Sequence, residues 1–167
     1  LFGCLGGSLR MLAAEEGRAG VEAEFPLRPV AVQHPADARA PLPLHESRVL
    51  VVDDNRISQQ VIRAMLGKGG WPVECVSSGE DALTRLGEQA YSLVLMDIQM
   101  PGLDGYETTR RLRESWALES LPVVALTADV SDEVRQQCRE AGMNDFLQKP
   151  VHLQQLLAMV NEWVQTT

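Results

Sequence analysis

The chain has 167 residues, of which 45% are hydrophobic and 23% are charged, and its formal net charge is −8. This composition is that of a globular protein with room for one well-buried domain and an accessory segment, and it excludes a disordered or fibrous chain. The acidic balance argues against nucleic acid as a direct partner, because phosphate backbones attract basic surfaces. It is compatible with binding a divalent cation or a basic protein face.

Cysteine usage and hydropathy limit the class of protein further. The cysteines Cys4, Cys75 and Cys138 are scattered without CxxC spacing, which predicts reduced thiols of a cytoplasmic protein and no disulfide framework. No apolar run approaches the ~20 residues that a helix needs to cross a bilayer. The chain starts at Leu1 without a methionine or a basic region, so we interpret this start as the cut end of a larger protein.

The first 46 residues differ in pattern from the rest. Residues 8–16 are expected to form a short helix with an apolar face, and residues 21–25 alternate apolar and polar side chains as a half-buried strand does. Prolines recur from residue 26 to residue 43 and block both a helix and a central strand. Residues 30–46 are therefore expected to be an extended linker.

From Ser47 onward, short apolar runs alternate with amphipathic segments. The expected strand and helix pairs are 49–52 with 57–66, 73–76 with 80–86, 93–96 with 106–112, 123–126 with 134–141, and 145–147 with 153–164. The strand segments are apolar on both faces, as parallel strands covered on each side must be, and the helices repeat apolar residues every three or four positions. These β–α repeats predict an α/β, doubly wound three-layer sandwich with a flavodoxin-like parallel sheet and an N-terminal extension.

Some helix ends carry their own signals. Ser78 and Ser131 are expected N-caps, because each precedes acidic residues in the first turn of a predicted helix. Gly67, Gly87 and Gly142 are expected to end three of the helices.

Polar residues follow four of the five predicted strands. The first strand ends in Asp53 and Asp54, the third in Asp97, the fourth in Thr127 and the fifth in Lys149. Ligands of an open parallel sheet bind outside the carboxyl ends of its strands, where the strand order reverses. We therefore expect three carboxylates, one hydroxyl and one ammonium to meet at one edge of the sheet.

Such a cluster predicts metal-assisted phosphoryl chemistry. Three carboxylates in contact repel one another, and Lys149 supplies only one positive charge, so the remaining charge and the all-oxygen donor set suit Mg²⁺. Mg²⁺ can bridge a carboxylate and a phosphoryl oxygen, and a carboxylate can act as the nucleophile to form an aspartyl phosphate. Taken singly, paired aspartates more often begin a helix and a lone lysine usually lies on the surface. Their joint occurrence at successive strand ends favours the catalytic interpretation.

Residues 47–167 resemble response-regulator receiver domains. The likeness rests on four motifs that match in order and spacing: Val-Leu-Val-Val-Asp53-Asp54-Asn, Leu-Val-Leu-Met-Asp97-Ile-Gln-Met-Pro-Gly-Leu-Asp-Gly, Ala-Leu-Thr127-Ala and Gln-Lys149-Pro. The resemblance implies that Asp97 is the phosphoacceptor. It also implies that Asp54 and Asp97, with the backbone carbonyl of Gln99, ligate Mg²⁺, and that Asp53 acts largely through a metal-bound water.

The remaining matched residues have implied roles beside the phosphoryl group. Thr127 is expected to hydrogen-bond to one phosphoryl oxygen and Lys149 to pair with another. Phe146 occupies the switch-aromatic position of the family, and its ring is expected to move inward when Thr127 is drawn toward the phosphoryl group. Gln99 and Asp129, each two residues past a catalytic position, are a hypothesis for tuning the hydrolysis of the aspartyl phosphate.

Residues 1–29 resemble the carboxyl-terminal end of a histidine-kinase ATPase domain, through Leu5-Gly-Gly-Ser-Leu-Arg-Met-Leu and Gly20-Val-Glu-Ala-Glu-Phe-Pro-Leu. The Asn-bearing helix and the acidic adenine-binding motif of such kinases are absent, so no ATP-dependent kinase activity is expected in this fragment. Only Mg²⁺-dependent self-phosphorylation from phosphodonors and autodephosphorylation are expected. The resemblance implies a cytoplasmic C-terminal receiver of a hybrid sensor histidine kinase whose parent protein is anchored in the inner membrane.

The phosphoryl donor is expected to come from another domain or protein. The sequence His45-Glu-Ser-Arg mimics the start of a phosphodonor helix, but it lies directly before the first strand and leaves no room for one. The expected partners are therefore a histidine-kinase phosphodonor domain and a histidine-phosphotransfer protein, with no nucleic acid, no direct membrane contact in this fragment, and homodimerisation left open.

Two other classes of function compete with this interpretation. A receiver fold used only for docking or dimerisation has no need for the intact set of Asp54, Asp97, Thr127 and Lys149. A flavodoxin-like cofactor binder needs a Ser/Thr/Gly-rich phosphate loop after the first strand, where this chain has carboxylates.

Overall fold

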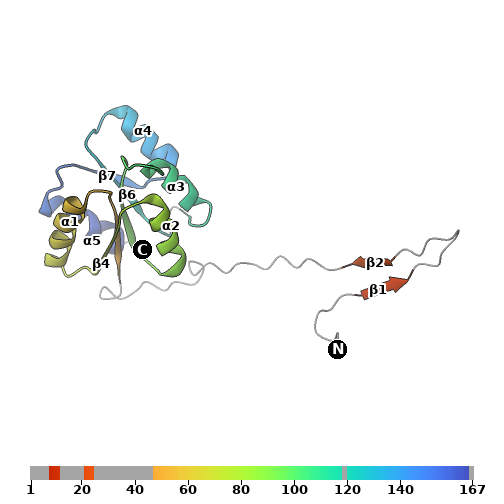
Figure 1. Cartoon of the computed structure of the whole chain (residues 1–167). Helices are drawn as coiled ribbons and strands as arrows, with labels where there is room; N and C mark the ends of the chain where they lie inside the picture. Colours follow the sequence, from red (N-terminus) through yellow and green to blue (C-terminus); the bar gives the residue numbers. More distant parts are fainter. Residues whose placement is uncertain (1–7, 12–20, 25–46, 118–119, 166–167) are drawn as a thin grey trace. The chain divides into compact units, whose positions relative to one another are not determined.

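The computed structural model describes residues 8–11, 21–24, 47–117 and 120–165 (Figure 1). The chain divides into two compact units, residues 1–33 and 34–167, and each is described by itself.

The first unit contains an antiparallel hairpin of β1 (Ser8–Met11) and β2 (Val21–Glu24), with Ser8 opposite Glu24 and Met11 opposite Val21. Strand β2 confirms the strand predicted from the alternating pattern over residues 21–24, and residue 25 lies outside the described residues. The helix expected from residue 8 is wrong over residues 8–11, which form β1. Residues 8–11 form a strand because they pair with β2, and the local spacing of apolar residues does not reveal a partner elsewhere in the sequence. The rest of that expected helix and the linker at 30–46 lie outside the described residues.

The second unit alternates strands and helices as the sequence predicts. Its elements are β3 (Val49–Val52), α1 (Arg56–Lys68), β4 (Val73–Val76), α2 (Gly79–Glu88), β5 (Leu93–Asp97), α3 (Gly105–Arg113), β6 (Val123–Thr127), α4 (Asp132–Ala141), β7 (Asp145–Gln148) and α5 (Leu153–Gln165). The strands form one parallel sheet of order β4-β3-β5-β6-β7. The strand order reverses between β3 and β5, so the carboxyl ends of these two strands mark the switch point of a flavodoxin-like fold.

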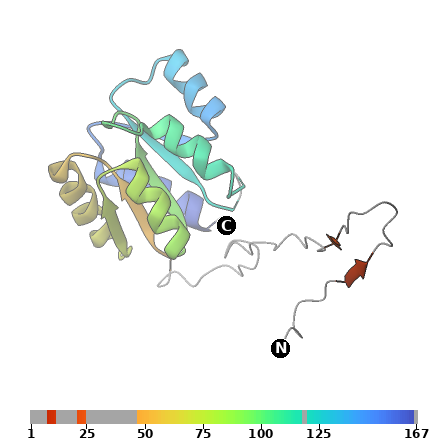
Figure 2. The ribbon, with the colours of Figure 1, turned by 45° about the vertical axis from the view of Figure 1, so that its right-hand side comes forward.

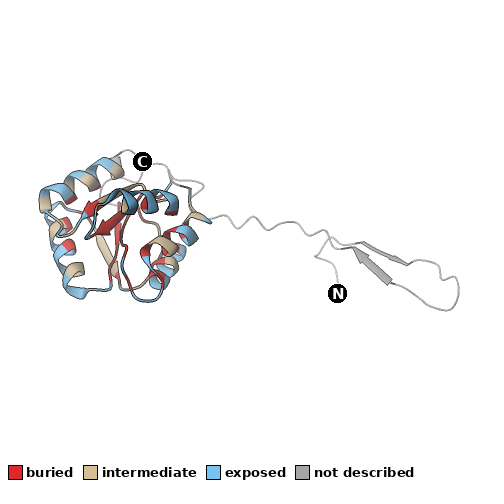
Figure 3. Cartoon of the chain, turned by 90° about the horizontal axis from the view of Figure 1, so that it is seen from above, coloured by how far each residue is buried: buried red, intermediate tan, exposed pale blue. Residues whose placement is uncertain are grey.

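The sheet lies between two layers of helices (Figure 2). Helices α1 and α5 pack on one face through Ile62, Leu66, Leu156 and Val160, and α2, α3 and α4 pack on the other through Ala82, Leu86, Leu112 and Cys138. The central strands β3, β5 and β6 are buried along their whole length, as Figure 3 shows for the middle of the unit. This burial explains why their sequences are apolar on both faces.

Capping signals are confirmed in part. The Ser78 hydroxyl accepts from the Asp81 N–H at 3.1 Å, and Ser131 caps α4 in the same way. Gly142 ends α4 with a left-handed φ of 86°, a conformation that favours glycine. The predicted ends at Gly67 and Gly87 are wrong, because α1 continues through Lys68 and α2 through Glu88. Glycine lowers helix propensity without forbidding the helix, and tertiary packing overrides it here.

The two tyrosines of the chain are held in their neutral form. Burial raises the pKa of Tyr91 to about 12, assisted by the hydrogen bond that its hydroxyl donates to Glu74 at 2.9 Å. Burial also raises the pKa of Tyr106 to about 12, with a further contribution from the Cys138 thiol.

Alkaline titration of tyrosine absorbance is expected to reveal this burial. Because the folded pKa values lie above the unfolded value of about 10, both tyrosines contribute stability that is complete below pH ~10 and is lost between pH ~10 and ~12. The folded chain should therefore form tyrosinate at distinctly higher pH than the chain in denaturant, with circular dichroism recorded to locate any unfolding. A folded chain in which one tyrosine titrates near pH 10 contradicts the expectation.

Candidate functional site

The predicted site residues meet at the switch point of the sheet. Asp53 follows β3 and Asp97 is the last residue of β5, and both side chains are buried, at 0% and 6% exposure. Asp54 is exposed beside them. One carboxylate oxygen from each of these three residues lies within 4.8 Å of the others, so the structure brings together the carboxylates that the sequence predicts.

Lys149 joins the two buried carboxylates. Its Nζ donates to Asp53 Oδ2 at 2.9 Å and lies 2.7 Å from Asp97 Oδ2. One ammonium among three carboxylates leaves the cluster two negative charges in excess. Oxygen donors with excess negative charge, one of them open to solvent, fit a hard divalent cation such as Mg²⁺, which keeps several waters.

Burial and charge shift the ionisation of this pair. Burial raises the pKa of Asp97, and the nearby Asp53 raises it further, while the hydrogen bond from Lys149 opposes both. Burial lowers the pKa of Lys149, but its hydrogen bonds to Asp97 and Asp53 outweigh that effect, so its pKa is raised overall. Lys149 is therefore a fixed cation at neutral pH, and the negative charge of an ionised Asp97 is poorly solvated.

Three residues of the β3–α1 junction orient Asp53, and the sequence interpretation missed all of them. The Asn55 N–H donates to Asp53 Oδ1 at 2.8 Å, and the Ser58 hydroxyl donates to Asp53 Oδ2 at 2.6 Å. Gln59 Nε2 donates to the Asp53 carbonyl at 2.7 Å and to the Val76 carbonyl at 3.1 Å, which ties the ends of β3 and β4 together. The N-cap preference of asparagine could have identified Asn55, whose side chain caps α1.

Gln99 and Thr127 lie beside the cluster with their own partners. The Gln99 N–H donates to Asp97 Oδ1 at 3.3 Å, so this residue contacts the central carboxylate through its backbone. The Thr127 hydroxyl donates to the Asp129 carbonyl at 2.8 Å and accepts from the Asp129 N–H at 3.1 Å. The Thr127 hydroxyl is thus engaged by the loop that follows it, although the Lys149 N–H donates to the Thr127 carbonyl at 2.7 Å.

Phe146 lies on β7, three residues before Lys149, and is half-buried. The guanidinium carbon of Arg135 lies 4.9 Å from the centroid of its ring. Phe146 therefore contacts α4 through Arg135. It is connected to the carboxylate cluster along the chain, because Lys149 follows three residues later.

Gly105 sets how closely α3 approaches Asp97. A Cβ at this position would lie 2.2 Å from the Asp97 carbonyl oxygen and 2.8 Å from Ile98 Cα. Because both obstacles are backbone atoms, Gly105→Ala is expected to lower the free energy of unfolding by about 3 kcal/mol.

Urea denaturation checks this expectation against Gly87→Ala. A Cβ on Gly87 meets nothing within 4 Å inside α2, so that variant should be more stable than wild type by about 0.5–1 kcal/mol through helix propensity alone. Equal midpoints for Gly105→Ala and wild type contradict the close approach.

Comparison with known proteins identifies the class to which this site belongs. The family model described as response regulator receiver domain matches residues 49–161, and the chain belongs to that family. The chain is 39% identical over 132 residues to sensor protein GacS of Pseudomonas syringae pv. syringae, a match that covers 77% of this chain and 14% of GacS. It therefore spans a small part of that relative's length.

Two solved structures are similar to the second unit. The receiver domain of the sensor histidine kinase PA1611 from Pseudomonas aeruginosa, solved with a magnesium ion coordinated in its active-site cleft, has a TM-score of 0.66 and 38% identity over 71% of this chain and 98% of that chain. The second structure is the co-crystal of the Saccharomyces cerevisiae histidine phosphotransfer protein Ypd1 with the receiver domain of Ssk1. It has a TM-score of 0.67 and 30% sequence identity, and the match covers 71% of this chain and 89% of that chain. The receiver family and the fold predicted from the sequence are thereby confirmed, and a phosphoacceptor role fits both comparisons.

The described helices include none that is long and apolar enough to span a bilayer.

Proposed function

We propose that Asp97 accepts a phosphoryl group from a phosphohistidine and forms an aspartyl phosphate. The observation that carries this proposal is the Lys149 ammonium, which lies 2.9 Å from Asp53 and 2.7 Å from Asp97 beside a third carboxylate. A carboxylate nucleophile needs neighbours that neutralise the incoming phosphoryl oxygens, and such a cluster supplies them.

The chain's own residues divide the chemistry. An Asp97 carboxylate oxygen forms the new P–O bond as the P–N bond to the donor imidazole breaks, and the electron pair of that bond leaves with the imidazole nitrogen. Lys149 pairs with one phosphoryl oxygen, and the Thr127 hydroxyl donates to another. Asp54, Asp97 and the Gln99 carbonyl would hold Mg²⁺, with Asp53 acting through a bound water, and the ion would neutralise phosphoryl charge during in-line transfer.

The proposed setting is a hybrid sensor histidine kinase, since GacS is a sensor protein and matches more of this chain than the receiver family does. On this proposal, residues 1–29 are the end of the kinase ATPase domain, residues 30–46 a linker and residues 47–167 the receiver. The proposed donors obtain their phosphate from ATP, which places the chain in the cytoplasm. Its partner is a phosphodonor domain or a histidine-phosphotransfer protein, as Ypd1 is for Ssk1.

We propose that this partner docks on α1. Helix α1 begins at Arg56, two residues after Asp54, and carries Ile57 and Val61, which are 72% and 45% exposed. Such exposed apolar residues one turn apart suit an apolar helix face on a partner that presents its histidine to Asp97.

Intact-mass spectrometry after incubation with Mg²⁺ and acetyl phosphate tests the proposed function. We expect one phosphoryl adduct that requires Mg²⁺, is absent with EDTA, and maps to the peptide that contains Asp97. If no adduct forms with acetyl phosphate or with a phosphohistidine donor, the proposal fails and the chain is a receiver fold that signals by contact alone.

A further inference from the structure

The Thr127 hydroxyl can donate a hydrogen bond either to the Asp129 carbonyl or to a phosphoryl oxygen on Asp97. It has a single proton, which it now donates to the Asp129 carbonyl at 2.8 Å. To donate to a phosphoryl oxygen on Asp97, it must give up that bond. Phosphorylation therefore competes with the hydrogen bond that holds the start of the β6–α4 loop.

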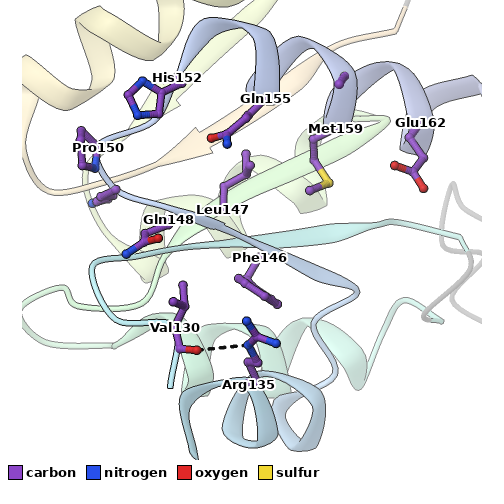
Figure 4. A pocket seen from close by; sticks show the side chains of 12 residues that line it. Val130, Arg135, Phe146, Leu147, Gln148, Pro150, His152, Gln155, Met159 and Glu162 are labelled. Carbon is purple, nitrogen blue, oxygen red and sulfur yellow. Dashed lines mark hydrogen bonds between the residues drawn. The ribbon is translucent and has the colours of Figure 1, made fainter. Parts of the chain in front are cut away.

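Arg135 contacts both this loop and Phe146. Its Nε donates to the Val130 carbonyl at 3.1 Å, and its guanidinium carbon lies 4.9 Å from the Phe146 ring centroid. Figure 4 shows the arginine side chain reaching from α4 between the Val130 carbonyl and the ring. These three residues line a cavity of about 680 Å³ that Lys149 also lines, so the contact lies beside the segment that carries the site lysine.

We propose that Arg135 is a positioning residue that couples the loop after Thr127 to Phe146 and stabilises the unphosphorylated arrangement of both. This inference rests on the proposed function, because it concerns the change that follows phosphorylation of Asp97. Val130 is three residues from Thr127, so a loop released from Thr127 moves the carbonyl that orients the guanidinium. Arg135 then loses the geometry in which it covers the Phe146 ring.

The sign of the effect on phosphorylation follows from linkage. A contact made only in the unphosphorylated arrangement opposes the phosphorylated one by the same free energy. The chain must leave the arrangement that Arg135 stabilises before Thr127 can donate to the phosphoryl group, so removing this contact raises the fraction of the chain that can react. Arg135 is exposed, and exposed cation–π contacts are weak, so this fraction, and with it the phosphorylation rate, should rise by about threefold.

The test compares Arg135→Met with Arg139→Met in the full chain. Both variants remove one positive charge from α4, but Arg139 donates to the Arg135 backbone carbonyl and not to the loop or the ring. Each protein is labelled with 4-fluorophenylalanine, and the resonance of residue 146 is assigned with Phe146→Leu, since the chain has three phenylalanines. Phosphorylation by acetyl phosphate and Mg²⁺ is followed by intact mass.

We expect Arg135→Met to shift the residue-146 resonance before phosphorylation and to raise the phosphorylation rate about threefold. Arg139→Met should change neither. Arg135→Lys, which keeps the charge without an Nε at the Val130 carbonyl, should shift the resonance and raise the rate less. An unshifted resonance in Arg135→Met overturns the contact, and a wild-type rate overturns the coupling. A wild-type chain that takes no adduct at all defeats the proposed function instead, and the coupling with it.

Discussion

Asp97→Asn is expected to abolish the phosphoryl adduct and, without Mg²⁺, to make the chain more stable. The amide lacks the nucleophilic carboxylate, so no aspartyl phosphate can form. The same change removes one of three clustered carboxylates that share a single lysine. Burial, followed by the charge of Asp53, raises the pKa of Asp97 in spite of Lys149, so its ionised form costs folding free energy at neutral pH.

The raised pKa of Asp97 also determines how the stability difference between Asp97→Asn and wild type changes with pH. A carboxyl group whose folded pKa exceeds its unfolded pKa contributes stability that is complete below the unfolded value and is lost as the pH rises through the folded value. The advantage of Asp97→Asn should therefore be absent in acid and reach on the order of 1 kcal/mol above the folded pKa.

Urea unfolding in EDTA and mass spectrometry with acetyl phosphate measure the two effects on one sample. Asp104→Asn is the matched control, because Asp104 caps α3 and asparagine caps equally well, so adduct and stability should both stay near wild type. An adduct on Asp97→Asn moves the phosphoacceptor to another residue. A variant less stable than wild type at neutral pH means that the Lys149 pair outweighs burial and repulsion.

The convergence of the site residues could be predicted from the sequence, because the carboxyl ends of parallel strands all lie at the same edge of the sheet. Each site residue lies at or just after the end of an apolar run that forms a strand of the parallel sheet, namely Asp53, Asp97, Thr127 and Lys149. Neither the hydrophobic pattern nor the turn residues needed tertiary information to indicate this convergence.

The residues that orient the site were not predictable in the same way. Ser58 and Gln59 reach Asp53 only because the first turns of α1 pack over the ends of β3 and β4, a register that helix periodicity leaves open. The bond between Thr127 and Asp129 likewise depends on a loop conformation. Strand β1 was missed for a related reason, since its partners in β2 lie 10 to 16 positions away along the chain, from Met11 with Val21 to Ser8 with Glu24.

The proposed docking of a phosphohistidine partner on helix α1 rests on the exposed side chains of that helix. Ile57 and Val61 are the exposed large hydrophobic side chains of the described residues, and they lie one turn apart next to Asp54. The charged residues of α1 are Arg56, Arg63 and Lys68, all basic, in a chain whose net charge is −8. An apolar stripe with a basic border fits a partner helix whose apolar face has an acidic border.

Replacing both Ile57 and Val61 by Asp is expected to slow phosphotransfer from a histidine-phosphotransfer protein roughly 100-fold, because two buried apolar contacts of about 1.5 kcal/mol or more are lost. Phosphorylation by acetyl phosphate should stay near the wild-type rate, since a small donor needs no docking surface. A control with Gln136→Asp and Gln154→Asp adds the same two negative charges at exposed positions of α4 and α5. The measurement is the initial rate with each donor, using a phosphotransfer protein that phosphorylates the wild-type chain. Equal losses of rate with both donors would mean that the substitutions damage the carboxylate cluster. No loss with either donor would show that α1 is not part of the docking surface. Only a loss confined to the protein donor separates recognition of the partner from the chemistry at Asp97.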